Sequence, residues 1–308
     1  MTESCSTFRT VTLPFIVFTA IWGSTWIVIR YQLGTVPAQW SVTYRFVVAS
    51  VAMALVANWK EESLRIGTKG IAAAAFLGLT QFCINFNAVY LAERHITSGV
   101  VATVFALLLI PSSLMAWALL GHRPSPRFAV SSLVAVGGTG LLFVHELQEH
   151  PADRAQIAAG IGLTLVGMLG ASVANVVQAR PEVRRFPLYA ILAWSMAAGA
   201  LIDGIIAIVM TGPPVFDPRP AYWFGVLYLA LLASVLTFSL YYPVVRRIGP
   251  GKAAYSSVLV PIIAMGFSTA FEGYRWTALT SAGALLALGG MVAALGRNRS
   301  KIAAPDAA

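Results

Sequence analysis

Long apolar stretches dominate the chain, and short polar or basic segments separate them. Each stretch holds about 20 residues, which is enough to cross roughly 30 Å of hydrocarbon as a helix. The apolar positions run on without the two-residue alternation of a membrane β-barrel. The pattern therefore predicts ten membrane-spanning helices, at residues 12–29, 38–57, 70–91, 97–119, 127–145, 156–179, 187–210, 221–243, 253–271 and 276–296.

A weak internal repeat runs through the chain with a spacing of 152 residues. Its matching positions include Tyr90 and Tyr242, Arg94 and Arg246, Gly99 and Gly251, and Gly138 and Gly290. Five spans per unit is an odd number, so the second unit must enter the membrane in the opposite orientation. We therefore expect an all-α integral membrane protein made of two inverted five-helix repeats, residues 12–145 and 156–296. Inverted repeats are a recurrent design of secondary transporters, with a substrate site near the membrane midplane.

Composition and charge agree with this reading. Apolar residues make up 58% of the chain and charged residues only 11%, whereas soluble domains carry about 25% charged residues. A net charge of +9 would suggest nucleic acid in a soluble domain, but the basic residues here are sorted by predicted side. Of the 21 Lys and Arg residues, 15 lie on one side, five on the other, and Arg45 within a span. Because cytoplasmic loops carry the excess, both termini are expected in the cytoplasm, with no nucleic-acid partner.

Several classes of chemistry are not expected. Cys5 precedes the first span and Cys83 lies inside the third, so neither a disulfide nor a metal site is predicted. All four histidines lie in loops or at span ends, and no Ser/His/Asp set stands out. No small-x-small cleavage site follows residues 12–29, so we expect this stretch to remain as a span. The chain should be neither an enzyme nor dependent on a cofactor.

Polar and aromatic side chains inside the spans are the candidates for solute contact. Trp22 and Trp26 share one helix face near the bilayer middle, although Trp ordinarily prefers the interface. Asn85 corresponds to Thr237 in the repeat, and such shared positions favour a common central cavity. Interhelical packing and hydrogen bonding are the alternative explanation. The predicted substrate-binding residues are Trp22, Trp26, Gln81, Asn85, Asn175, Gln178, Thr237, Phe238 and Tyr241.

Two prolines interrupt the fourth and ninth spans. Pro111 and Pro261 each have paired serines nearby, and their positions in the repeat differ by two residues. A proline frees a carbonyl one turn earlier, which a membrane tolerates only where a neighbour or a wet cavity meets that group. We expect a helix kink or a gate at each, a plain kink being the simpler alternative.

Two charged residues lie inside predicted spans. Arg45 is in the second span and Asp203 in the seventh, and buried charges in lipid are functional suspects. A structural role is favoured for Arg45, whose long stem can reach the interface; a pair with Asp203 is the alternative. Spans 1, 3, 4, 6, 8 and 9 hold no acid, which indicates a neutral or zwitterionic solute without obligatory ion coupling.

Several segments resemble the EamA family of the drug/metabolite transporter superfamily over about residues 12–297: Trp22-Gly23-Ser24, Arg45-Phe46, 90–99 and Gly137-Gly138. The resemblance implies a ten-helix exporter of the bacterial inner membrane, with spans 1, 3, 4, 6, 8 and 9 around a central cavity. The overall likeness is to the family's aromatic amino-acid exporters, which implies Phe, Tyr or Trp as solute. A carrier of another metabolite such as a purine, a channel or a scaffold are alternatives. The expected partners are a small-molecule substrate and the lipid bilayer, and the expected state is a monomer.

Overall fold

A computed structural model of the protein describes residues 8–121, 123–149, 153–248 and 256–295. Within these ranges the chain is helical apart from short connections, and no β-strand is present among them. Both chain termini, residues 150–152 of the predicted connector and the predicted start of the ninth span at 253–255 lie outside the described residues.

The helices follow the predicted apolar stretches in order. The first half contains η1 (Phe8–Thr12), α2 (Leu13–Gln32), α3 (Ala38–Trp59), α4 (Gly67–Leu77), η2 (Gly78–Ile84), α5 (Asn85–Ala92), α6 (Ser98–Phe105), η3 (Ala106–Leu108), α7 (Leu109–Leu120) and α8 (Pro126–Glu149). The second half contains α9 (Arg154–Ala179), α10 (Pro181–Arg184), α11 (Leu188–Thr211), α12 (Pro220–Leu227), η5 (Tyr228–Leu236), α13 (Thr237–Ile248), α15 (Ser256–Phe271) and α16 (Ala278–Leu295). Among the described residues, eight continuous helical stretches are long and apolar enough to cross a membrane, and two shorter apolar helices follow.

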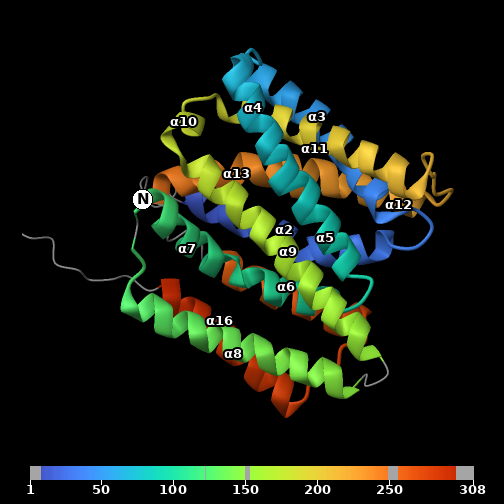
Figure 1. Cartoon of the computed structure of the whole chain (residues 1–308), viewed down its shortest axis with the longest axis vertical. Helices are drawn as coiled ribbons and strands as arrows, with labels where there is room; N and C mark the ends of the chain where they lie inside the picture. Colours follow the sequence, from blue (N-terminus) through green and yellow to red (C-terminus); the bar gives the residue numbers. More distant parts are fainter. Residues whose placement is uncertain (1–7, 122, 150–152, 249–255, 296–308) are drawn as a thin grey trace, which may run out of the picture.

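The helices form an inner group between two outer pairs (Figure 1). One outer pair is α3 with α11, and the other, at the opposite edge, is α8 with α16. Between them lie α2, α5, α6, α9, α13 and α15, where α2 packs on α13 and α15, and α9 packs on α5 and α6. This arrangement matches the one that the family resemblance implies, with the second, fifth, seventh and tenth spans outside.

Small residues bring α8 and α16 into backbone contact. A Cβ atom added at Gly290 would lie 2.5 Å from the Ala135 nitrogen, and one added at Gly283 would lie 2.8 Å from the Gly138 oxygen. Gly138 in turn faces Ala287. The contact is reciprocal under the 152-residue spacing, because Gly138 corresponds to Gly290 and Ala135 to Ala287. Close backbone approach of this kind is a common way for helices to associate in lipid.

Two of the long stretches contain a π-helical segment at corresponding positions. In the third stretch η2 separates α4 from α5, and in the eighth η5 separates α12 from α13. Adding 152 to the bounds of η2 gives residues 230–236, which fall inside η5. Wide turns of this type are rare in α-helices and often mark functional sites.

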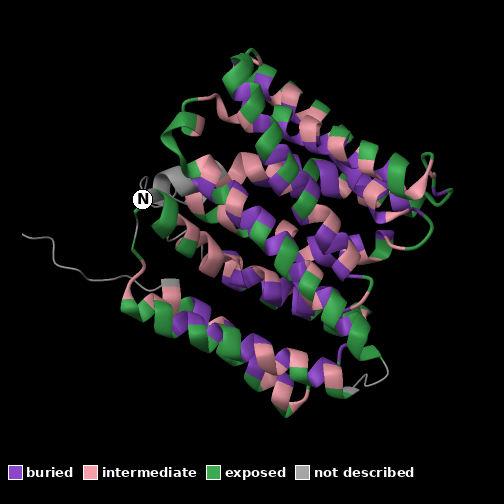
Figure 2. Ribbon diagram, in the orientation of Figure 1, coloured by how far each residue is buried: buried purple, intermediate pink, exposed green. Residues whose placement is uncertain are grey.

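Packing differs between the two ends of the fourth helical stretch, which is formed by α6, η3 and α7 (Figure 2). In α6, which lies toward the predicted outer end, every side chain except Phe105 is buried. In α7, which continues the same stretch toward the predicted cytoplasmic end, none of the described side chains at 109–119 is buried. Within this fourth stretch the packing is therefore tighter toward the predicted outer end than toward the other.

Candidate functional site

A cluster of aromatic rings lies between α2 and α13. The Trp22 ring centroid is 5.2 Å from that of Tyr241 and 5.9 Å from that of Phe238. Phe18, one turn before Trp22, lies 5.4 Å from both Trp22 and Tyr241. These separations suit edge-to-face and tilted ring contacts. Three of the predicted substrate-binding residues, Trp22, Phe238 and Tyr241, are thus in direct contact.

The carbonyl of Ala233 in η5 holds two predicted residues together. Trp22 Nε1 donates to it over 3.3 Å, and Thr237 Oγ1 donates to it over 2.7 Å. A π-helical turn leaves such carbonyls without their usual partner four residues later. The Thr237 bond is the ordinary one of a helical threonine to the carbonyl four residues earlier, as at Thr43 and Thr164. The same backbone oxygen thus accepts from an indole of α2 and a hydroxyl of α13.

The ring contacts continue from this cluster into the first half of the chain. Phe238 lies 6.3 Å from Phe82, and Phe82 lies 4.9 Å from Phe46. Phe46 in turn lies 4.9 Å from Phe86. We call the connected set the aromatic row: Phe18, Trp22, Tyr241, Phe238, Phe82, Phe46 and Phe86. It joins α2, α3, η2, α5 and α13, and its rings pack against one another, with Phe18, Phe46 and Phe82 fully buried.

Arg45 lies at the α3 end of the aromatic row and is only 1% exposed. Its guanidinium carbon is 4.4 Å from the centroid of the Phe86 ring. Nε and Nη2 donate to Ser234 Oγ over 3.3 and 3.2 Å, and Nη1 has no hydrogen-bond partner within the part of the chain that the structure describes. Asp203 accepts a hydrogen bond from Asn87 Nδ2 over 2.6 Å instead of pairing with Arg45. The alternative of an Arg45–Asp203 pair is therefore wrong.

The remaining predicted residues do not join the aromatic row. Trp26 packs on Phe105 of α6, with ring centroids 5.5 Å apart, and its Nε1 has no partner. Asn85 is buried against α9, where a Cβ added at Gly167 would lie 3.4 Å from its Oδ1. Of the other polar positions, Gln81 and Gln178 are half-buried, and Asn175 is exposed.

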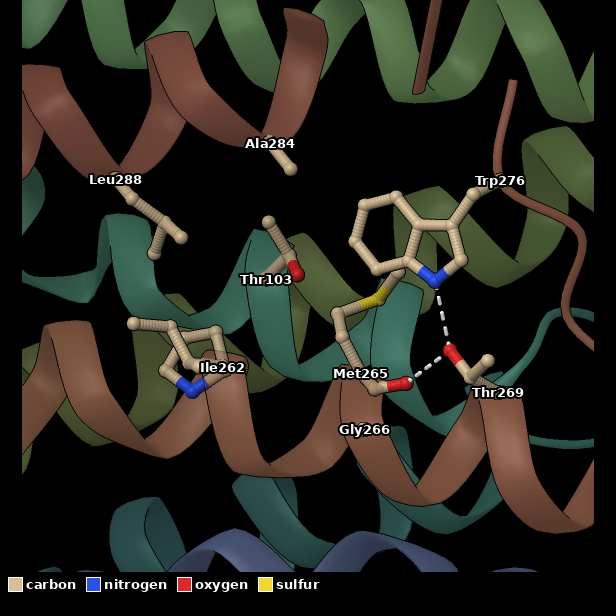
Figure 3. A pocket seen from close by; sticks show the side chains of 9 residues that line it. Thr103, Ile262, Met265, Gly266, Thr269, Trp276, Ala284 and Leu288 are labelled. Carbon is tan, nitrogen blue, oxygen red and sulfur yellow. Dashed lines mark hydrogen bonds between the residues drawn. The ribbon is translucent and has the colours of Figure 1, made fainter. Parts of the chain in front are cut away.

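The two prolines have different surroundings. Pro111 lies in the first turn of α7, directly after the 3₁₀ segment η3, so the fourth stretch changes its helical geometry there. Pro261 lies inside α15, which is assigned as one unbroken helix. Pro261 lines a cavity of about 370 Å³ between α6, α15 and α16, where Trp276 Nε1 donates to Thr269 Oγ1 over 2.8 Å (Figure 3). Its lining is largely apolar, and Pro261 is the one predicted residue among the residues that line it.

A polar network links the ends of α2, α5, α6 and α15 at the predicted outer end of the inner group. Arg30 lies 3.6 Å from the Glu272 carboxylate and donates to the Glu93 carbonyl. Glu272 accepts hydrogen bonds from the backbone nitrogen and the hydroxyl of Ser98, at the start of α6. Glu93 is fully buried, and neither of its carboxylate oxygens has a hydrogen-bond partner. Burial, and to a lesser degree the Glu272 carboxylate, raises the pKa of Glu93 well above its ordinary value.

Sequence reasoning missed part of this arrangement. Phe18 carries a detectable signal, because it precedes Trp22 and Trp26 at four-residue spacing on the same helix face. Phe82 and Phe86 carry none, since phenylalanine is equally common on lipid-facing surfaces of membrane helices. The contact between Arg45 and Ser234 also has no local signal, because it depends on which helices are neighbours.

Comparison with known proteins agrees with the fold. The model of the EamA-like transporter family matches residues 11–144 and again residues 158–296. The uncharacterized transporter YoaV of Bacillus subtilis (strain 168) is 21% identical, over 83% of this chain and 87% of YoaV. The uncharacterized inner membrane transporter YedA of Escherichia coli (strain K12) is 25% identical, over 84% of this chain and 83% of YedA.

A solved structure gives the same result at the level of the fold. One crystal structure has a TM-score of 0.66 to this chain at 16% sequence identity, covering 92% of this chain and 95% of that one. The family model covers most of the chain, and the described helices have the length and composition of membrane spans. The chain therefore belongs to the EamA-like transporter family, and is a multi-pass membrane transporter rather than an enzyme.

Proposed function

We propose that this protein exports aromatic or other apolar amino acids across the bacterial inner membrane by alternating access. The aromatic row is the observation that carries the proposal. Its rings reach from Tyr241 and Trp22 in the inner group to Phe46 of α3, and the stack of flat apolar rings suits an aromatic side chain once the helices open. The overall likeness to the bacterial aromatic amino-acid exporter YddG points to the same solutes.

Alternating access in this proposal uses two inverted repeats of five helices each. Three observations support the repeats. The family model matches the chain twice, η2 and η5 fall at corresponding positions, and the α8–α16 contact is reciprocal at Gly138 and Gly290. Two related halves meeting at a midplane site are the usual basis for exposing one site to either side in turn.

We further propose that transport needs no obligatory ion coupling. An acid inside the membrane is the usual proton relay, and the sequence has none in the first, third, fourth, sixth, eighth and ninth predicted spans. Asp203 lies on α11, in an outer pair, and bonds to Asn87. The solute gradient would then set the direction of flux.

A substrate panel in proteoliposomes tests the proposal. Labelled phenylalanine should exchange without a pH or sodium gradient, and unlabelled Phe, Tyr or Trp should compete better than Ser or Asp. Purine bases belong in the panel, because they also present flat rings. Exchange of labelled adenine, with no exchange of labelled phenylalanine, would favour the purine carrier instead.

A further inference from the structure

Arg45 is a buried cation without an acidic partner. Among the described residues, the ion pairs are Arg30 with Glu272 and Arg219 with Asp217, and neither involves Arg45. Removing a charge from water is costly unless it is paired and fully hydrogen-bonded. A negatively charged group bound beside Arg45 would therefore stabilise this buried cation.

The hydrogen bonds of Arg45 leave one end of its guanidinium vacant. Nε and Nη2 share a single acceptor, Ser234 Oγ, whose own proton goes to the Leu229 carbonyl over 2.9 Å. Nη1 is buried and has no hydrogen-bond partner among the described residues. The Tyr90 hydroxyl also lies near the guanidinium, but its proton goes to Gln32 Oε1 over 2.9 Å, and it carries no negative charge. The rings of Phe86 and Phe46 lie 4.4 and 5.2 Å from the guanidinium carbon and stabilise the cation through their π faces, but they accept no strong hydrogen bond.

The vacant end of Arg45 adjoins the aromatic row. Phe46 and Phe86 belong to the row and also contact the guanidinium. A solute with an aromatic body and a carboxylate therefore fits both features at once. The planar guanidinium is well suited to a carboxylate, which it binds through two parallel hydrogen bonds.

We propose that Arg45 binds the carboxylate of the transported solute, while the aromatic row receives its ring. This inference rests on the proposed function and deepens it, since it makes the carboxylate a requirement for recognition. Because Nη1 is covered in the structure described here, the side chains around it must move before the solute binds. Ser234, in η5, keeps the guanidinium oriented from the opposite side.

Competition by solute analogues tests the inference in the unaltered protein. 3-Phenylpropionate keeps the ring and the carboxylate of phenylalanine, and phenethylamine keeps the ring and the amine. The first should compete with labelled phenylalanine, and the second should compete about ten- to a hundredfold less well, the range for a lost hydrogen bond to a charged group. Equal competition by phenethylamine would overturn the inference.

Substitution of Arg45 separates recognition from a structural role. In Arg45→Gln the ratio of the two analogues' inhibition should approach one, and Arg45→Lys should retain part of the preference because it keeps the charge. A purely structural arginine would lower the amount of folded protein but leave the ratio unchanged, which would contradict the inference. If Arg45→Gln does not fold, the ratio in Arg45→Lys and the wild-type competition decide.

Binding in detergent distinguishes this inference from the proposed function. Thermal stabilisation of the purified protein by 3-phenylpropionate, with none by phenethylamine, supports carboxylate binding without any transport step. Stabilisation of this kind without exchange of aromatic amino acids would refute the proposed function alone. Stabilisation by neither compound, or by both alike, would refute the role of Arg45.

Discussion

Substitution of Trp22 tests the proposed site most directly, because this side chain contacts three other members of the aromatic row. Its indole N–H also bonds to the Ala233 carbonyl across the interface between α2 and η5. The side chain thus combines ring area with a fixed orientation. Both properties are useful for stacking against a planar solute.

Replacing Trp22 by alanine should weaken transport of phenylalanine while leaving the protein folded. An aromatic contact is worth about 0.5–1.5 kcal/mol beyond area burial, so the half-saturation concentration should rise about two- to twelvefold. Trp22→Phe is the matched control, because it keeps a ring and loses the N–H, and its effect should be smaller. Unchanged half-saturation in Trp22→Ala would show that the solute does not contact this ring.

Residue types and repeat positions predicted only part of this site. Trp22, Phe238 and Tyr241 were expected from aromatic residues within spans, and their rings do meet. Asn85 was expected in the same cavity, but its side chain lies against α9. Whether a side chain faces the aromatic row or a neighbouring helix depends on how its own helix is rotated, and a shift of one residue is enough to change this. The π-helical segment η2, directly before Asn85, rotates the following residues in this way. No residue type in the sequence predicts such a segment.

At the scale of the element, the two adjacent glycines of α8, Gly137 and Gly138, have different surroundings. Gly138 faces the α16 backbone, whereas a Cβ added at Gly137 meets nothing within 4 Å. Glycines inside membrane helices are typical of close helix approach, and the structure shows such an approach at Gly138. The sequence did not predict which member of the pair makes the contact, because that depends on the orientation of α8 against its partner.

Gly138→Ala should therefore destabilise the protein and Gly137→Ala should not. The added methyl at Gly138 has no room beside α16, and overpacking typically costs about 1–3 kcal/mol. At Gly137 the same change relieves the helix cost of glycine, so stability should stay equal or rise slightly. Thermal unfolding in detergent measures both, and equal effects at the two positions would contradict the packing described here.

The turn after α5 should respond to pH through Glu93. Its pKa is raised by burial first and by Glu272 second, and Arg30 opposes the shift. The folded state therefore keeps a proton that the unfolded state releases above about pH 4.3. The contribution to stability is present below that value, and it is lost as pH rises toward the raised pKa.

Glu93→Gln should remove the loss of stability that the wild type shows as pH rises, because glutamine does not titrate. Relative to the wild type, the variant should melt at a higher temperature at about pH 8 and differ little at about pH 4. Glu182→Gln, an exposed position on α10, controls for the change in net charge. A parallel pH dependence in wild type and Glu93→Gln would show that another group carries it.

At the scale of the whole molecule, orientation follows from the loops. The basic residues predict that residues 146–154 lie outside and that the loop around α10 lies inside. In that orientation the network of Arg30, Glu272 and Ser98 would lie at the outer ends of α2, α15 and α6.

Cysteine labelling in whole cells tests this orientation. In a background with Cys5→Ser and Cys83→Ala, a membrane-impermeant reagent should modify Gln148→Cys and spare Glu182→Cys until the cells are opened. Both positions are exposed, so accessibility alone should not distinguish them. Labelling of Glu182→Cys but not Gln148→Cys in intact cells would reverse the topology.

The succession of spans followed from apolar length, because lipid leaves a helix few alternatives. Their grouping into inner and outer helices was implied only by the family resemblance. The polar network at the predicted outer end had no signal in the sequence, because Arg30, Glu93 and Glu272 come from three separate hairpins. Their meeting depends on how α2, α5 and α15 are assembled. No local pattern carries that information.

The central claim, that this protein is a carrier with one site exposed to each side in turn, is tested most directly by trans-acceleration. Labelled phenylalanine uptake is measured in proteoliposomes that are either empty or preloaded with unlabelled phenylalanine. A carrier returns faster with solute bound, so preloading should raise the initial rate several-fold, and the rate should saturate with concentration. An initial rate that is the same in both cases and rises linearly with concentration would indicate a pore and contradict the account.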